Sequence, residues 1–448
     1  MGRCVQNNKM SLTDTLGLGF MTFAFFLGAG NLIFPPLAGY LAGENMTLAM
    51  IGFLVTAVTL PLITLIAVAK ANGKVMGLLP AFAATALAIA IYIIIGPAFA
   101  APRAGLVAYE MGYKPFIADS SATFEFAGIV LNSSQLLYTT IFFGIAMLLS
   151  LFPGKLLDSV GKVLTPIMLL LLMGLAGAVI VLPGAEVSQA VGDYQSNPLT
   201  KGILEGYNTM DTLASLIFGM LIIDILRKKG IDAPKEQTKY LVRAAFIAAG
   251  GLAFVYISLF YLGATAGDLA VGADNGGIIL TNYVNHQFGG LGQVLLAAVV
   301  TLACLTTVVG LVSACAEYFN ELMPKLSYRL LVVVMSITCA TVANVGLAQL
   351  ISISIPVLVT IYPVAIALVA VTYLTERFNQ PEFAHRAVLS IALFFGIIDG
   401  LKAAGVDMSI FNFMPLHNEG MAWLLPTGVT ILLCLMSKRS AKPEAVLN

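Results

Sequence analysis

The sequence predicts an all-α integral membrane protein with about 12 transmembrane helices, of which the first and the sixth are broken. Of the 448 residues, 59% are hydrophobic and 10% are charged, whereas soluble globular proteins carry about 25% charged residues. Several apolar runs reach the roughly 20 residues that a helix needs to cross a bilayer. Polar segments that begin with glycine interrupt two of these runs.

The predicted spans form two repeats of five helices and a final pair. The first repeat covers residues 12–182, the second covers 203–374 and the last two spans lie within 386–437. The remaining ends, 1–11 and 438–448, are expected to be cytoplasmic tails. The individual spans are 12–41, 46–69, 78–108, 136–152, 159–182, 203–227, 239–264, 291–319, 329–345, 347–374, 386–400 and 421–437.

The positions of lysine and arginine predict the orientation. With the N-terminus in the cytoplasm, every Lys and Arg falls on the inner side except Arg103, Lys114, Lys201 and Lys402. Short cytoplasmic loops of membrane proteins carry such an excess of positive charge. We therefore expect both termini inside. The polar start leads directly into a full-length span, so no cleavable signal peptide is expected.

The first interruption is the segment FFLGAGNLIFPP at residues 25–36. Pro35 and Pro36 lack a backbone N–H, so carbonyls one turn earlier lose their partners. In hydrocarbon an unpaired carbonyl costs several kcal/mol and persists only where protein, water or a ligand satisfies it. We infer that this helix is broken and that its free ends bind cargo. The alternative is a packing face of small residues with a proline kink.

The second interruption, GYNTMD at residues 206–211, opens the sixth span as the first one marks span one. Two broken spans at equivalent places in two five-span units indicate an inverted repeat. The second unit enters the membrane from the opposite side, because an odd number of spans separates the two. The two broken helices are then expected to face each other near the middle of the bilayer.

Free helix ends suit an amino-acid zwitterion, because they carry partial charges of both signs. Its carboxylate can contact N–H groups at the glycines of the first break, and its ammonium can face exposed carbonyls in both breaks. Such a site requires no charged side chain. The candidate substrate-binding residues are Ala24, Phe25, Gly28, Ala29, Gly30, Asn31, Tyr207, Asn208, Thr209 and Met210.

The rest of the pocket is expected to be apolar. Such a pocket separates neighbouring aliphatic side chains by only about 1–3 kcal/mol per methylene. Similar aliphatic amino acids should share it, and charged ones would lose hydration. Its candidate lining residues are Phe25, Phe99, Ala100, Met210, Leu213 and Leu305.

Two neighbouring threonines, Thr306 and Thr307, lie deep in the eighth span. Threonines in a helix often bond back to a carbonyl one turn earlier, and that is the simpler interpretation. Together with carbonyls of a broken neighbour, however, two hydroxyls would form an oxygen site suited to Na⁺.

Some polar residues predict structure rather than chemistry. We favour Asp211 as the N-terminal cap of the apolar part of span six, with proton or cation coupling as the alternative. Arg103 and Glu110 are interpreted as a solvated helix end rather than an outer gate. Residues 263–292 are expected to form a plain surface loop rather than a gate.

The remaining composition indicates neither an enzyme nor a nucleic-acid-binding protein. The three histidines fall in predicted loops, and the cysteines have no metal-ligand spacing. Four of the cysteines lie in apolar spans, where we expect small buried side chains. The chain has no basic tract for nucleic acid, so its expected partners are a small amino acid and the lipid bilayer, without a cofactor.

Three segments resemble the bacterial branched-chain amino acid carrier family, the BrnQ or LIVCS type, also called branched-chain amino acid transport system II. They are FLGAGNLIFPPLAGYLAG (26–43), GYNTMDTLAS (206–215) and ACLTTVVGLVSACAEYF (303–319). The resemblance extends from Leu12 to about Met436. It implies the amino acid–polyamine–organocation superfamily, a LeuT-type five-plus-five inverted repeat and the bacterial inner membrane. It also implies symport of leucine, isoleucine and valine with Na⁺, or with H⁺ in some members.

More distantly, residues 28–35 and 303–307 resemble the sodium-coupled LeuT-type transporters. The spacing after Asn31 is one residue shorter here. By that resemblance one Na⁺ would be bound by the carbonyls of Ala24, Leu27 and Ala303 and the hydroxyls of Thr306 and Thr307. An H⁺-coupled carrier is the alternative, and a membrane channel or receptor ranks below it.

Overall fold

The computed structural model describes residues 10–117, 122–126, 129–152, 165–182 and 185–437. They form two compact units, and the boundaries between these units fall after Gly73 and inside the helices α5 (Ala81–Ile93) and α14 (Leu347–Leu374). The predicted tails 1–11 and 438–448 lie almost entirely outside the described residues. The division into two five-helix repeats stays a prediction.

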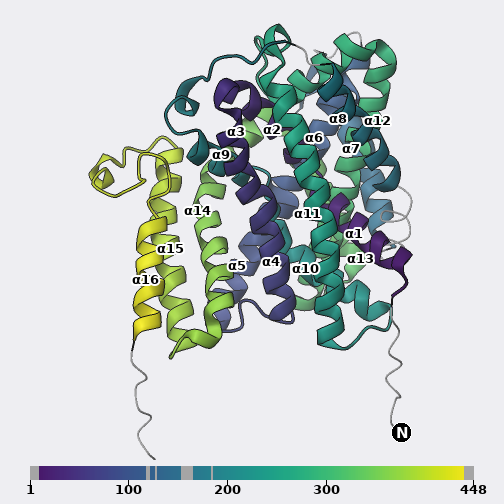
Figure 1. The fold of residues 1–448 in the computed structure, drawn as a ribbon. Coiled ribbons are helices and arrows are strands. Elements are labelled where there is room, and N and C mark those ends of the chain that lie inside the picture. The colour runs from purple at the N-terminus through teal and green to yellow at the C-terminus, as the bar shows by residue number, and fades with distance from the viewer. Residues whose placement is uncertain (1–9, 118–121, 127–128, 153–164, 183–184, 438–448) are drawn as a thin grey trace, which may run out of the picture. The chain divides into compact units, whose positions relative to one another are not determined.

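The first unit contains the two broken spans and most of the other helices (Figure 1). Side chains cap several of its helix starts: Ser11 accepts from the N–H of Asp14, and Asn132 accepts from the N–H of Gln135. The helices that lie wholly in this unit are α1 (Leu12–Phe26), α2 (Ala29–Ala42), α3 (Met46–Leu54), α4 (Leu60–Lys70), α6 (Ala100–Gly112), α7 (Ser133–Ser150), α8 (Thr165–Val181), α9 (Pro198–Tyr207), α10 (Asp211–Lys228), α11 (Pro234–Ala264), α12 (Gly276–Leu322) and α13 (Tyr328–Val342).

The second unit contains most of α14, together with α15 (Pro381–Ala403) and α16 (Leu424–Met436). A Cβ on Gly396 would lie 2.6 Å from the carbonyl oxygen of Thr360, so α14 and α15 pack at close range. Figure 1 draws α15 and α16 side by side at the yellow end of the chain, and these two helices are in contact.

Each predicted span overlaps at least one of these helices. Within the described residues, eight helical stretches are long and apolar enough to cross a membrane, and α9 with α10 makes a ninth if the bent pair is one span. The helices α1, α8 and α16 are apolar but shorter. The all-helical membrane class is therefore confirmed, whereas the count of 12 spans is not established.

A β-hairpin is an addition that the sequence analysis did not predict. The strands β1 (Thr123–Phe126) and β2 (Ile129–Asn132) pair antiparallel just before α7. Their sequences, TFEF and IVLN, are rich in the aromatic and β-branched residues that favour strands.

The prediction of a plain surface loop at residues 263–292 is wrong. A 3₁₀ turn covers Gly267–Ala270, and α12 already begins at Gly276, where the Asn275 side chain accepts from the N–H of Gly277. The helix is kinked at Gly289, whose φ of 58° requires glycine. The buried Tyr283 donates its hydroxyl to the carbonyl of Leu182 at 2.6 Å. These buried contacts, rather than glycine content, determine the conformation of the segment.

The interpretation of all three histidines as loop surface is also wrong. His385 lies in α15 and is buried, and its ring contacts the hydroxyl of Thr375. His417 lies outside a helix but is buried as well. By contrast, the four cysteines in apolar spans are buried, as predicted.

Glycines bring α2, α3, α9 and α11 into backbone contact. A Cβ on Gly52 of α3 would lie 2.1 Å from the carbonyl oxygen of Leu199 in α9, and one on Gly39 of α2 would lie 2.1 Å from that of Phe260 in α11. Small residues permit such close approach between membrane helices. These contacts position the two broken spans against their neighbours.

Candidate functional site

The first break separates α1 from α2 at Leu27 and Gly28. Leu27 leaves the helical region with ψ 85°, and Gly28 is extended, with φ −118° and ψ −161°. The prediction of an interrupted first helix is therefore confirmed. The prolines do not cause the break, because α2 continues through Pro35 and Pro36. The N–H groups in the first turn of α2 and the last carbonyls of α1 have no partner within their own helices.

The second break separates α9 from α10, which are bent by 41° relative to each other. The N-cap of α10 is Met210, which has left-handed backbone angles of φ 64° and ψ 10°. A left-handed conformation is uncommon and costly for a residue other than glycine, and such strain gathers at functional sites. Thr209 donates its hydroxyl to the carbonyl of Gly206 at 2.9 Å, which closes the turn.

Asn31 connects the two breaks. Its Oδ1 accepts from the N–H of Gly28 at 2.9 Å, and its Nδ2 donates to Asp211 Oδ2 at 2.7 Å and to the hydroxyl of Tyr256. Tyr256 in turn donates to Asp211 Oδ2 at 2.8 Å. The favoured interpretation of Asp211 as a helix cap is therefore wrong. Asp211 is the first residue of α10, and its carboxylate binds side chains from α2 and α11 instead.

Arg103 lies in the first turn of α6 and is 2% exposed, so its interpretation as a solvated helix end is wrong. Its Nη2 donates to the carbonyl of Asn208 at 2.7 Å, and its guanidinium carbon lies 5.2 Å from the centre of the Phe34 ring. Glu110 instead forms an ion pair with Lys114 at 2.8 Å. The helix restarts at Ala100 after the non-helical Gly96, and this places Arg103 toward the breaks.

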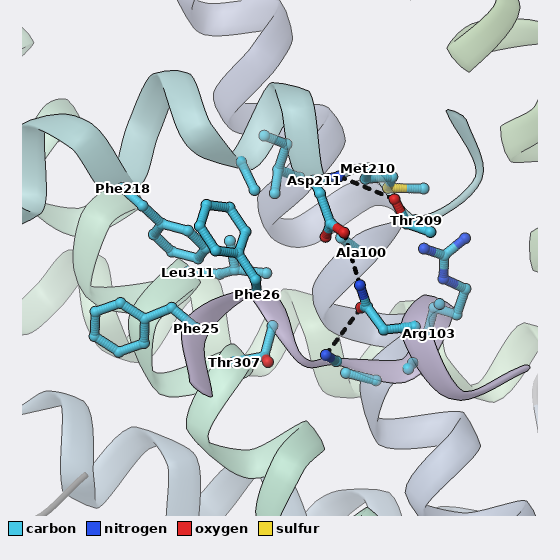
Figure 2. Close-up of a pocket in the computed structure, with 17 residues that line it drawn as sticks. Phe25, Phe26, Ala100, Arg103, Thr209, Met210, Asp211, Phe218, Thr307 and Leu311 are labelled. Atoms are coloured by element: carbon cyan, nitrogen blue, oxygen red, sulfur yellow. Dashed lines mark hydrogen bonds between the residues drawn. The ribbon is translucent and has the colours of Figure 1, made fainter. Parts of the chain in front are cut away.

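A small cavity lies between the two breaks (Figure 2). Its volume of about 20 Å³ is room for about one water molecule. Of the candidate substrate-binding residues, seven line it: Phe25, Gly28, Ala29, Gly30, Asn31, Thr209 and Met210. The other three, Ala24, Tyr207 and Asn208, lie outside its wall. Their roles in substrate binding stay predictions.

The apolar wall differs in part from the predicted one. Phe25, Ala100 and Met210 line the cavity, whereas Phe99, Leu213 and Leu305 do not. Figure 2 shows Phe25, Phe26 and Phe218 grouped on one side of the cavity. The apolar lining residues that were not predicted are Phe26, Ile95, Ala104, Ala214, Phe218 and Leu311. Helical periodicity could have indicated Leu311, because it lies one turn after Thr307. Phe218 lies two turns after Asp211 and could have been found in the same way.

The two threonines of α12 reach across to the end of α1. Thr306 Oγ1 lies 2.9 Å from the carbonyl oxygen of Ala303 and 3.3 Å from that of Ala24. Thr307 Oγ1 lies 3.2 Å from the carbonyl oxygen of Ala24 and 3.1 Å from that of Leu27. Back-bonding to Ala303 is therefore present, but it is only part of a larger oxygen cluster. The five atoms that the resemblance implies as Na⁺ ligands lie together.

Comparison with known proteins gives a consistent result. The family model described as "Branched-chain amino acid transport protein" matches residues 11–441. The chain is 46% identical over 432 residues to the branched-chain amino acid transport system 2 carrier protein of Pseudomonas aeruginosa, covering 95% of this chain and 96% of that protein. It is 41% identical over 440 residues to the branched-chain amino acid permease BrnQ of Escherichia coli, covering 97% and 98%.

Two solved structures share the fold at low sequence identity. One is Mhp1, a nucleobase-cation-symport-1 family transporter, in a closed conformation with bromovinylhydantoin bound. It has a TM-score of 0.57 and 15% identity, with 95% of this chain and 94% of that chain covered. The other is MhsT in complex with L-phenylalanine, with a TM-score of 0.54, 14% identity, and 94% and 97% covered. The predicted LeuT-type fold is thereby confirmed.

Proposed function

The chain belongs to the branched-chain amino acid transport protein family, and from this membership we propose that it imports leucine, isoleucine and valine by symport with Na⁺. Its relatives are named as carriers and permeases and not as enzymes. The multi-pass helical fold places the chain in a membrane, and the bacterial relatives support the inner membrane.

The oxygen cluster between α1 and α12 is the observation that carries the sodium proposal. It contains the carbonyl oxygens of Ala24, Leu27 and Ala303 and the hydroxyl oxygens of Thr306 and Thr307. Each hydroxyl has one proton to donate but lies near two carbonyls. The five buried oxygens therefore have only two hydroxyl protons among them, and a hard cation would satisfy lone pairs that these protons leave open. No acidic side chain is needed for this.

The position of the cluster explains how Na⁺ would act on transport. Two of its carbonyls belong to the end of α1, next to Gly28, and the other atoms belong to α12. A bound ion would hold α1 against α12 and so fix the first break in its substrate-binding form. Each elementary charge that enters along the membrane potential adds about 2.3 kcal/mol per 100 mV to the driving force.

The small volume of the cavity supports a transport cycle with a conformational change. About 20 Å³ admits a water molecule but not leucine, so the wall must move before leucine can bind. We propose that the first two spans of each repeat rock against the remaining helices. The phenylalanines and Met210 would then contact the aliphatic side chain, and their apolar surface would accept leucine, isoleucine and valine alike.

Sodium-dependent uptake of leucine into proteoliposomes tests the proposal. Labelled leucine should accumulate in an imposed inward Na⁺ gradient, and isoleucine and valine should compete more strongly than alanine or lysine. Counterflow of labelled leucine separates a carrier from a channel. Uptake that ignores Na⁺, or that lysine inhibits as well as isoleucine does, would contradict the proposal.

Proton coupling is a second candidate, and the buried Asp211 favours it. This carboxylate lies among three helices with Asn31 and Tyr256 as partners, and acidic groups within a membrane are often functional. An imposed pH gradient in sodium-free buffer distinguishes the two. Leucine accumulation under that condition supports protons, and its absence there together with accumulation in Na⁺ supports sodium.

A further inference from the structure

Two ionisable side chains face the cavity between the breaks. Among the described residues that line it, only Arg103 and Asp211 can carry a charge, and each is 2% exposed. They come from different helices, α6 and α10, and line the same small cavity. Buried charges are costly unless they are paired, and such groups in a cavity often mark a functional site.

We infer that Arg103 and Asp211 recognise the two charges of the amino acid: Arg103 binds the α-carboxylate and Asp211 binds the α-ammonium group. This inference rests on the proposed transport function and names the residues that restrict it to zwitterions. It differs from the expectation that backbone groups alone bind the substrate charges.

Arg103 lies where the free N–H groups of the first break begin. A Cβ on Gly30 would be 2.8 Å from Arg103 Nη2, so the guanidinium lies directly against the first turn of α2. The N-terminus of a helix already favours an anion, and guanidinium donors match a carboxylate in geometry. The hydrogen bond to the carbonyl of Asn208 and the Phe34 ring hold the arginine in this place. A carboxylate there would contact both the backbone and the side chain.

Asp211 has the complementary arrangement. The hydrogen bonds from Asn31 and Tyr256 both end on Oδ2. A carboxylate has about four acceptor positions, so the group has capacity for an ammonium donor from the cavity. The two partners also fix the orientation of the carboxylate.

Charge balance then gives specificity. The cavity wall carries one positive and one negative side chain, and a zwitterion brings one charge of each sign. A ligand with only one of its two charges would leave either Arg103 or Asp211 without its counterpart in a dry site, which is unfavourable. The site is therefore expected to reject aliphatic amines and aliphatic acids although they carry the same aliphatic side chain as leucine.

Three ligands that share the side chain of leucine test this charge recognition by binding to the wild-type protein in nanodiscs at saturating Na⁺. They are leucine, leucinamide, which lacks the carboxylate, and 4-methylpentanoate, which lacks the ammonium group. We expect both analogues to bind at least about 30-fold more weakly than leucine. Equal affinity for leucine and either analogue would overturn the assignment of the matching residue.

Two substitutions assign each charge to its residue. Arg103→Gln should weaken leucine and 4-methylpentanoate binding at least about 30-fold but should not weaken leucinamide binding, because it removes the charge that leucinamide leaves without a counterpart. Asp211→Asn should weaken leucine and leucinamide binding but should not weaken 4-methylpentanoate binding, for the same reason. Arg103→Lys keeps the charge, so its affinity for leucine should lie between that of Arg103→Gln and that of the wild-type protein. Lys114→Gln is the control, because Lys114 is exposed just after the end of α6. It should change the affinity for none of the three ligands.

The outcomes separate this inference from the transport function. If the wild-type protein neither binds nor transports leucine, the transport function fails. If it transports leucine but Arg103→Gln weakens leucine and leucinamide by the same factor, Arg103 is structural and the inference is wrong. If Arg103→Gln does not give a monodisperse protein, Arg103→Lys and the wild-type ligand series decide.

Discussion

The two breaks are built from different chemistry. The break at Gly28 uses neutral groups: an extended glycine, the amide of Asn31 and carbonyls that face two threonine hydroxyls. The break at Met210 uses a strained backbone and has charged side chains beside it, with Arg103 on a carbonyl of the turn and Asp211 at the start of α10. One break presents oxygen atoms without a formal charge, and the other lies between two opposite charges.

This difference indicates a division of tasks. Neutral oxygens can surround a small cation without binding it so tightly that it cannot leave, whereas fixed charges favour a ligand that carries charges itself. We therefore expect changes at the oxygen cluster of the first break to act mainly on Na⁺ and changes at residues beside Arg103 or Asp211 to act mainly on leucine. Asn31 belongs to both and should affect both.

The double variant Thr306→Ala, Thr307→Ala is expected to show the largest difference between the effect on the Na⁺ requirement and the effect on substrate preference. The double variant removes two of the five oxygens of the cluster, and loss of metal ligands or their supports costs 10–100-fold or more. The Na⁺ concentration for half-maximal uptake should rise about 100-fold. The preference for leucine over isoleucine and valine should stay as it was.

Uptake of labelled leucine against Na⁺ concentration measures this effect. Thr301→Ala on the same helix is the matched control, because Thr301 contacts Tyr138 rather than α1. Unchanged sodium dependence in the double variant would show that the cation assignment is wrong.

Asn31→Ala should follow, with effects on both ligands. The change removes the acceptor for the N–H of Gly28 and a donor to Asp211, and each loss costs about 1–3 kcal/mol. Both the Na⁺ requirement and the KM for leucine should rise about tenfold or more. An effect on only one of them would contradict the role of Asn31 as the connection. Asn45→Ala, at a carbonyl of Tyr194, is the control.

Smaller effects, each on a different ligand, are expected from alanine substitutions at the two glycines of the first break. A Cβ on Gly28 would lie 3.1 Å from Thr307 Cγ2, whereas one on Gly30 would lie 3.1 Å from the carbonyl of Asn208 and close to Arg103. Overpacking costs about 1–3 kcal/mol. Gly28→Ala should raise mainly the Na⁺ requirement, and Gly30→Ala mainly the KM for leucine. The same pattern in both variants would remove the distinction between the oxygen cluster and the charged pair.

The smallest effect concerns the strained turn. Met210→Ala and Met210→Gly both remove a buried thioether, but only glycine relieves the left-handed backbone, which costs about 1–2 kcal/mol for other residues. We expect Met210→Gly to be the more stable of the two by about 1 kcal/mol in thermal unfolding. The reverse order would show that the turn is not strained.

Much of the fold was predictable because membrane helices follow from local sequence. Apolar length predicted the spans, and the segments at residues 25–36 and 206–211 predicted both breaks, although Pro35 and Pro36 lie inside α2 and do not cause the first one. The lateral partners of these segments were harder to predict. The threonine pair was proposed as a Na⁺ site from its position in an apolar span, but only the packing of α12 against α1 brings the Thr307 hydroxyl to Leu27.

The errors share a physical cause. Arg103 and Asp211 were interpreted from their own helices, as a solvated end and as a cap. Their partners are Asn208, Asn31 and Tyr256, which lie far away in the sequence. One amino-acid sequence by itself gives no signal for such contacts, because they depend on how the helices pack. Helix packing also explains why Leu305, although predicted, does not line the cavity.

The glycines that join α2 to α11 and α3 to α9 have a mechanical consequence. No layer of flexible side chains separates the helices at Gly39, Gly52 and Gly202, because the main chain there packs directly against the main chain of the neighbouring helix. A joint of that kind is stiff, so a displacement imposed at one end should reach the other almost undiminished. A displacement caused by Na⁺ binding beside Gly28 would then reach the far ends of these helices. A larger residue at any of these glycines would separate the helices and reduce the transmitted displacement.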